Sequence, residues 1–200
     1  KQVGIPRNSD YNGESQEGIA MSQATISNGR RMSTAYCYLK PIKHRTNLTI
    51  LSNAQTSSLI LEKKKCKGVE FFHKGAIKKV MSLREVILCA GTINSPQLLE
   101  LSGIGRPEIL EKAGIPLRHH LDGVGENLRD HYAPRTRWLI GKQGVTYNDK
   151  AKGLGLFWQG LRYVFQQKGL MANPIAPMRA FVKTRAGLEA PDALLGWVPL

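Results

Sequence analysis

The sequence predicts a mixed α/β fold on the strength of three observations. Between residues 48 and 81, short apolar stretches alternate with turns rich in glycine and lysine, as is typical of β-strands. An unbroken apolar run, Val86–Ala90, then has the pattern of a strand buried on both faces of a sheet. Helix caps and glycine stops follow between residues 95 and 114. Strands followed by helices indicate a mixed architecture.

Four strands and one short helix are predicted ahead of the apolar run. The strands are expected at Leu48–Leu51, Thr56–Leu61, Val69–Phe72 and Ala76–Met81. The last two form a hairpin around a Lys-Gly turn at residues 74 and 75, because glycine and its neighbour tolerate the backbone of a tight turn. The helix is expected over residues 31–39, where Pro41 would stop it.

The segment after the apolar run predicts two helices. Ser95 can cap the first of them, Pro96 suits its first turn because proline has no N–H to satisfy, and Gly103 supplies its stop. The second helix is expected over Arg106–Gly114. Between strand and first helix, Gly91 permits close approach of a ligand, at the end of the strand where α/β sheets bind dinucleotides.

The later part of the chain predicts a second set of elements. A strand is expected at Pro134–Ile140, an amphipathic helix at Gly155–Lys168 and another strand at Arg179–Lys183. The sequence shows no internal repeat and no low-complexity segment.

Charge and cysteine content narrow the classes of function. The chain has 29 basic and 15 acidic residues and a formal net charge of +14, which would permit nucleic-acid binding. Its densest lysine cluster, residues 63–67, falls in a predicted hairpin turn and has no interleaved aromatic residues, so a solvated loop is the better interpretation and no nucleic-acid partner is expected. No stretch is apolar for long enough to span a bilayer.

The three cysteines, Cys37, Cys66 and Cys89, lack metal-ligand spacing, so no metal is expected. Cys89 is interpreted as a core residue of the strand. Their odd number favours a reducing compartment. A cytoplasmic location is therefore expected, with membrane association kept as an alternative.

A resemblance to a known family rests on five segments in order. The stretch GTINSPQLLELSGIG, residues 91–105, resembles the second signature of the glucose, methanol, choline (GMC) family of FAD-dependent oxidoreductases. The stretch LDGVGENLRDH, residues 121–131, is similar to the family's GVGxNLxDH segment. Upstream, DYNGESQEG at residues 10–18, residues 28–41 and NLTIL at residues 47–51 follow the family's order. Among its members, the chain looks most like bacterial alcohol and choline dehydrogenases.

The resemblance implies a fold, a cofactor and a set of contacts. Residues 1–131 would form part of a Rossmann-like FAD-binding domain with a β-meander, and residues 132–200 would begin a substrate domain with an antiparallel sheet. Thr56 occupies the position whose backbone meets the FAD adenine, while Ala90 and Gly91 match positions beside the adenosine and pyrophosphate. Thr56 read simply as a sheet residue is an almost equally good interpretation. Asn127, Asp130 and His131 are interpreted as turn-stabilising residues, because Asn and Asp readily bond to nearby backbone.

The resemblance also implies that this chain is an internal fragment without catalytic residues of its own. The family's catalytic His is expected beyond residue 200, and its GxGxxG fingerprint before Lys1, since no GxGxxG occurs here. His44, His73, His119 and His120 have no evident carboxylate partner in the sequence. The implied activity is oxidation of a primary alcohol to an aldehyde by hydride transfer to FAD. Because residues 150–188 contain no acidic side chain, a neutral alcohol is expected as substrate. The sequence favours neither oxygen nor a quinone or dye as electron acceptor.

Two other classes stay open from the residues. One is a different two-domain dinucleotide-dependent dehydrogenase, which would need a G-x-G-x-x-G with a downstream acidic residue. The other is a non-catalytic or truncated FAD-binding relative, which the lack of catalytic residues suggests. Neither explains the five ordered segments.

Overall fold

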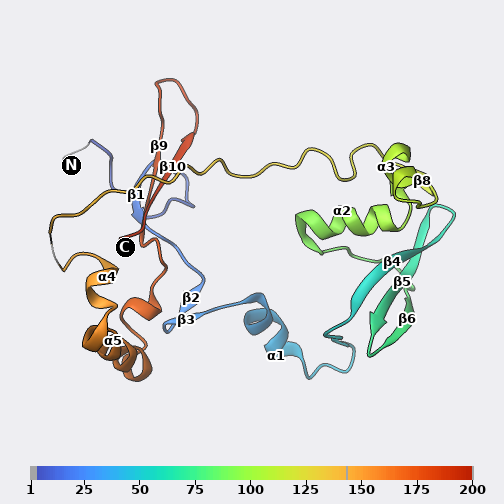
Figure 1. Ribbon diagram of the computed structural model, residues 1–200, viewed down its shortest axis with the longest axis horizontal. Helices are drawn as coiled ribbons and strands as arrows, with labels where there is room; N and C mark the ends of the chain where they lie inside the picture. Colours follow the sequence, from blue (N-terminus) through green and yellow to red (C-terminus); the bar gives the residue numbers. More distant parts are fainter. Residues whose placement is uncertain (1–3, 143, 200) are drawn as a thin grey trace. The chain divides into compact units, whose positions relative to one another are not determined.

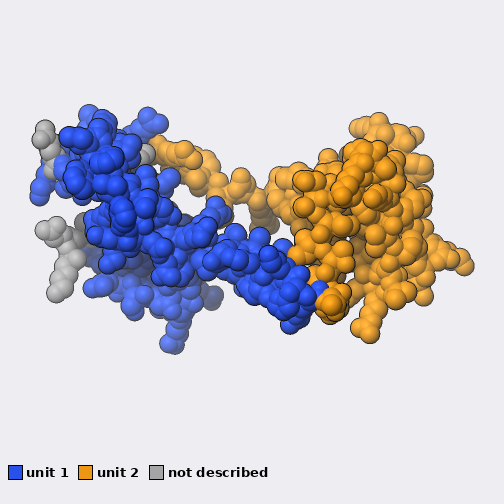
Figure 2. Space-filling view, turned by 90° about the horizontal axis from the view of Figure 1, so that it is seen from below, with its two compact units in different colours: residues 1–45, 137–200 blue, residues 46–136 orange. Residues whose placement is uncertain are grey.

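The computed structural model describes residues 4–142 and 144–199. The chain forms two compact units, which Figure 2 distinguishes by colour: residues 1–45 with 137–200 make unit 1, and residues 46–136 make unit 2. Each unit contains a three-stranded antiparallel sheet. The predicted mixed class of helices and sheets is therefore confirmed.

The sheet of unit 2 is a meander. Strands β4 (Gln55–Glu62), β5 (Lys65–His73) and β6 (Ala76–Met81) pair in chain order (Figure 1). The β5–β6 turn places Lys74 at φ 52° and Gly75 at φ 78°. Two successive positive φ values give a turn whose twist matches that of the flanking strands. The predicted β-meander and its hairpin turn are confirmed.

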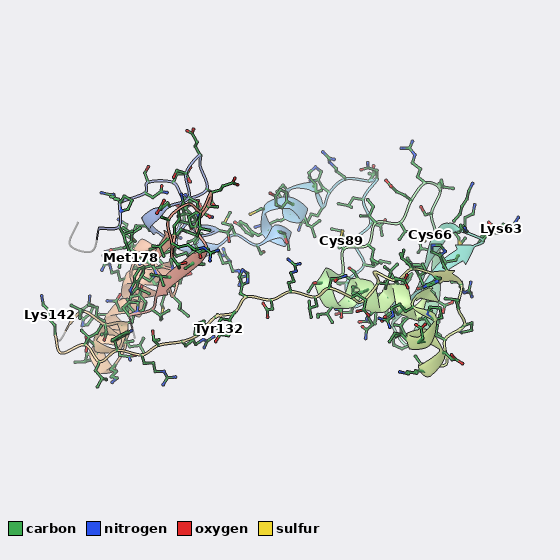
Figure 3. The ribbon with its side chains drawn as sticks, turned by 90° about the horizontal axis from the view of Figure 1, so that it is seen from above. Lys63, Cys66, Cys89, Tyr132, Lys142 and Met178 are labelled. Atoms are coloured by element: carbon green, nitrogen blue, oxygen red, sulfur yellow. The ribbon has the colours of Figure 1, made fainter. Side chains whose placement is uncertain are left out.

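The lysine cluster lies at the β4–β5 turn, as predicted. Figure 3 labels Lys63 in this turn and Cys66 at the start of β5. The ammonium of Lys67 lies 3.5 Å from the carboxylate of Glu62, and both side chains are substantially exposed. These contacts fit a solvated hairpin.

Two helices and two short strands complete unit 2. They are α2 (Gly91–Leu101), β7 (Ile104–Gly105), α3 (Pro107–Lys112) and β8 (His119–His120). Helix α2 packs against β4, and β7 pairs with β8 in parallel. Gly103 follows α2 at φ 81°, where a Cβ would lie 2.5 Å from the carbonyl oxygen of Pro116. The glycine stop is thus required both by the turn and by the close approach of the chain.

Ser102 joins α2 to the sheet. Its buried hydroxyl accepts a hydrogen bond from the backbone N–H of Leu59 at 2.8 Å and donates to the carbonyl of Leu98 at 2.6 Å. Leu98 on the helix and Phe71 on β5 are both buried. A single hydroxyl therefore fixes the C-terminal end of α2 on the middle of β4.

The first helix begins earlier than predicted. It starts at Gly91, so Ser95 and Pro96 lie inside it. Ser95 does not cap this helix as predicted; its Oγ accepts a hydrogen bond from the backbone N–H of Ala90 at 3.0 Å. The prediction was wrong because it assigned the glycine wholly to the connection, whereas the positive φ of Gly91 lets the chain enter the helix at once.

Three predicted strands are not formed. Val86–Ala90, Leu48–Leu51 and Pro134–Ile140 carry no strand assignment. Ile87, at the centre of the apolar run, is 75% exposed, and Cys89 is exposed as well. A strand needs a partner for its backbone groups, and none of the strands in the described residues pairs with these segments. The apolar composition of Val86–Ala90 therefore predicted a buried strand, but the structure leaves this segment unpaired and its centre exposed.

Unit 1 is built on a sheet that brings distant residues together. Strands β1 (Gly18–Met21) and β10 (Ala193–Trp197) pair on either side of β9 (Met178–Val182). Ala180 on the central strand is fully buried. Figure 3 labels Met178 at the start of β9. The prediction of a strand near residues 179–183 is confirmed, whereas β1 and β10 were not predicted.

The loop before β1 is anchored by an aromatic residue. Tyr11 is buried, and its ring lies 5.1 Å from the ring of Phe181, measured between centroids. Its hydroxyl accepts the backbone N–H of Gln23 at 2.6 Å. The Tyr11 side chain therefore ties the loop before β1 both to β9 and to the residue that follows β1 closely.

The remaining elements of unit 1 are short strands and helices. They are β2 (Ile26–Ser27), β3 (Arg30–Arg31), the π-helix η1 (Ala35–Leu39), α1 (Lys40–Ile42), α4 (Tyr147–Lys150), α5 (Gly153–Gln166) and the 3-10 helix η2 (Leu170–Ala172). The amphipathic helix is confirmed as α5. The helix expected to stop at Pro41 instead continues through it, because Pro41 lies in the first turn of α1, where its missing N–H costs little.

The compact units do not follow the predicted boundary at residue 131. Strand β1 pairs with β9, although the prediction placed them in separate domains. The assignment of cofactor binding to residues 1–131 and of substrate binding to 132–200 stays a prediction.

We expect Ser102→Ala to lower the free energy of unfolding by about 1–3 kcal/mol, because it leaves the N–H of the half-buried Leu59 without its hydrogen-bond acceptor. Ser57→Ala is the control, since the exposed Ser57 hydroxyl donates to the carbonyl of Glu70 at 3.1 Å and water can replace it. Equilibrium urea unfolding measures both. Equal effects of the two substitutions would contradict the structural role of Ser102.

Candidate functional site

The strongest candidate site is the turn into α2. Gly91 has φ 85°, a backbone conformation that other residues rarely adopt. A Cβ built on Gly91 would meet no heavy atom within 4 Å. The conformation therefore requires glycine, while the space beside it is left open by the chain. This combination allows a ligand to approach the backbone closely.

The start of α2 adds an electrostatic reason for a ligand there. The first N–H groups of a helix have no partner within the helix, and the peptide dipoles place partial positive charge at this end. No acidic side chain lies in the first turn of α2. A phosphate or another anion would be favoured at this position. Ala90, exposed and immediately before the helix, lies at the same end.

Thr56, the third predicted contact, lies on β4. It pairs with Phe71 of β5 and is half-buried, next to a register irregularity between Thr56 and Ser58. Helix α2, which begins at Gly91, packs against the same strand. All three predicted residues thus belong to unit 2, although no hydrogen bond within the described residues joins Thr56 to Ala90 or Gly91.

A hollow of about 400 Å³ lies beside the start of β4, and the sequence did not predict it. Its lining combines apolar with basic and polar side chains: Ile50, Leu51, Ser52, Asn53, His73 and Lys74. The Nδ1 atom of His73 lies 3.2 Å from the carbonyl oxygen of Asn53, whose φ is 54°. The asparagine at position 53 was the one sequence signal available, since Asn tolerates a positive φ better than most residues.

The turn before His131 spans residues 122–125, and residues 126–131 carry no turn assignment. Asn127 has φ 58°, and the carboxylate of Asp130 accepts the N–H of His131 at 2.7 Å. The side chain of His131 is 97% exposed. The turn-stabilising role expected for Asn127, Asp130 and His131 stays a prediction.

One histidine does have a carboxylate partner, contrary to the sequence-based expectation. The Nε2 atom of His120 lies 2.6 Å from Oδ1 of Asp122, and both side chains are exposed. The two residues are separated by a single position in the sequence, so the proximity could have been noticed. In the described part of the chain, no group of three or more His, Cys, Asp or Glu side chains could hold a metal ion.

None of the helices in residues 4–142 and 144–199 is long and apolar enough to cross a membrane.

A glycine with positive φ thus opens directly onto the N-terminus of α2, which packs against the antiparallel meander. Residues 1–133 match the family model described as GMC oxidoreductase. The chain belongs to this family, as its sequence motifs predicted. The predicted cofactor, FAD, agrees with that membership.

Several curated relatives match the whole chain. An oxygen-dependent choline dehydrogenase of Photobacterium profundum is 40% identical over 202 residues, which cover 100% of this chain and 35% of the relative. The protein of the same name from Vibrio vulnificus is 38% identical, with the same coverage. The chain thus spans about a third of the length of these relatives.

Solved structures agree on the fold. Formate oxidase superposes with a TM-score of 0.83 at 24% identity, covering 99% of this chain and 38% of the other. Pyridoxine 4-oxidase from Mesorbium loti is 31% identical with a TM-score of 0.58, covering 60% of this chain and 24% of the other.

Proposed function

We propose that this chain is part of an FAD-dependent oxidoreductase that converts a small primary alcohol to an aldehyde. The observation that carries the proposal is the open, positive-φ turn at Gly91, which lies within the segment that matches the family. FAD, when bound, supplies the acceptor for a hydride. The chain's own residues would hold and orient it.

Three residues would make the cofactor contacts. Gly91 and Ala90 would lie against the pyrophosphate side, where the absence of a Cβ at Gly91 permits close approach and the α2 N-terminus favours negative charge. The backbone of Thr56 would contact the adenine, so the identity of its side chain should matter little. Ser102 fixes α2, which begins at Gly91, on β4, which carries Thr56. The joined helix and strand would therefore support the pyrophosphate and the adenine of the cofactor together.

We assign no catalytic residue within this chain. A general base needs hydrogen-bond reach to its substrate and a suitable environment, and His131 is almost fully exposed beside Asp130. His120 pairs with Asp122 on the surface of unit 2. A histidine contributed from another part of the full-length protein would remove the hydroxyl proton. A non-catalytic FAD-binding relative remains the second candidate, because the described residues hold no base positioned for this step.

The substrate is proposed to be a neutral alcohol. Residues 150–188 carry no acidic side chain, and a quaternary ammonium group without a carboxylate would lose its hydration at a cost of several kcal/mol. Choline is the competing candidate, which the names of the relatives favour. Those names also favour oxygen as electron acceptor.

The first prediction concerns cofactor binding. Full-length protein should purify yellow with FAD, whereas the 200-residue chain alone should bind FAD weakly, because the sequence contains no GxGxxG cradle. Visible absorbance and release of flavin on denaturation measure this. A colourless full-length protein would refute the cofactor, and a stoichiometric complex of the chain alone would refute the need for the missing cradle.

The second prediction separates cofactor contact from backbone strain. Gly91→Val in the full-length protein should lower FAD occupancy well beyond any loss of folded protein. Gly114→Val is the matched control, because Gly114 also has a positive φ (67°) and open space for a Cβ, yet lies at the end of α3. Thr56→Val should retain full occupancy. If Gly91→Val and Gly114→Val lower the flavin-to-protein ratio equally, Gly91 serves only the turn.

The third prediction concerns the substrate. The value of kcat/KM should be higher for a medium-chain or benzylic alcohol than for choline, since a neutral molecule leaves no unpaired charge in the pocket. Steady-state kinetics on the full-length enzyme compare the two. A preference for choline would show that a carboxylate from elsewhere in the protein completes the site.

A further inference from the structure

The turn into α2 is held by a side chain of the helix itself. The Oγ atom of Ser95 accepts the backbone N–H of Ala90, five residues earlier, at 3.0 Å. Cys89, which Figure 3 labels, immediately precedes this turn. In the part of the chain that the structure describes, no other side chain bonds to the backbone of Ala90 or Gly91. The half-buried Ser95 hydroxyl therefore closes the chain around the glycine.

The backbone at this turn has the geometry of a nest, a concave group of N–H donors. Ala90 has φ −86° and ψ 6°, and Gly91 has φ 85°. A residue near the right-handed region followed by one in the left-handed region directs successive N–H groups toward one point, where anions bind. The N–H groups of Gly91 and Thr92 lie in the first turn of α2, in which the helix offers no acceptor. A single anionic group can accept hydrogen bonds from both.

The bond to Ser95 limits the conformations open to this pair of residues. Glycine populates positive and negative φ about equally, so an untethered turn would leave the nest geometry for part of the time. Folding gains little from the bond, because Ala90 is exposed and water can take over its N–H. Helix propensity does not favour serine at position 95 either, since alanine is the better helix former. The hydroxyl thus affects the shape of the turn more than the stability of the fold.

We propose that Ser95 is a positioning residue for FAD. Its hydroxyl holds Ala90 and Gly91 in the arrangement that aims the N–H groups of Gly91 and Thr92 at phosphate oxygens of the cofactor. This inference rests on the proposed function, which places the pyrophosphate at the turn. The first turn of α2 contains no acidic side chain that would compete for these donors.

The test uses full-length apoprotein reconstituted with FAD, with quenching of flavin fluorescence as the measure of binding. Ser95→Ala and Ser95→Cys should each raise the dissociation constant about three- to tenfold, the range of one neutral hydrogen bond. Ser95→Thr keeps an acceptor oxygen and should bind FAD as the wild type does. Ser82→Ala is the matched control, because the Ser82 hydroxyl also accepts a backbone N–H, that of Arg84 at 3.3 Å, in a turn outside α2.

Thermal unfolding of the apoprotein separates positioning from structural support. The midpoint for Ser95→Ala should equal or exceed that of the wild type, because alanine favours the helix. In a Gly91→Ala background, Ser95→Ala should weaken FAD binding by a smaller factor than it does alone, since both changes act on one turn. Additive effects, or a loss of apoprotein stability that matches the loss of affinity, would overturn the positioning role.

Failure of this inference is distinguishable from failure of the proposed function. Wild-type affinity in both Ser95→Ala and Ser95→Cys would refute the role of Ser95 alone. A wild-type apoprotein that binds no FAD would refute the proposed function and this inference with it.

Discussion

The contact between Ser102 and β4 is the constraint on which the candidate site depends. Without it, α2 would have only apolar packing to set its position along the strand, and such packing tolerates sliding more readily than a hydrogen bond of fixed geometry. The hydroxyl bonds at once to a strand N–H and to a carbonyl of its own helix. The other end of the same helix carries Gly91, so the location of the turn is set eleven residues away from the residue that fixes it.

The sequence predicted those parts of unit 2 that depend on neighbouring residues, and it missed those that depend on distant segments. The hairpin about Lys74 and Gly75 was predictable because its signal is local: two residues must adopt positive φ, and glycine marks one of them. The strand expected at Val86–Ala90 was not formed, because pairing is a property of a neighbouring segment that composition does not specify. The start of α2 at Gly91 was not predicted, because Pro96 favours the first turn of a helix and indicated a later start, whereas the conformation of Gly91 lets the helix begin there.

The candidate site was predictable only as separate pieces. Ala90 and Gly91 were identified from a motif, and the structure adds why the second must be glycine: a positive φ and an open side. The hollow beside β4 depends on Asn53 and His73, which come together only when the meander forms. Their separation of twenty residues leaves no periodic signal, so a pattern search could not join them. The roles of Ala90 and Gly91 stay predictions from the sequence, whereas the hollow is seen only in the folded chain.

Unit 1 shows the same limit more strongly. Its sheet pairs β1 with β9, across some 160 residues, and unit 2, residues 46–136, lies between them in the sequence. Unit 1 is therefore not a single consecutive segment of the sequence. After β1, the chain passes through η1 and α1 before it enters unit 2 at residue 46. Strand β1 thus joins the end of the early motif at residues 10–18 to a sheet whose other two strands, β9 and β10, follow α5 in the sequence, so this sheet could not be predicted from local pattern.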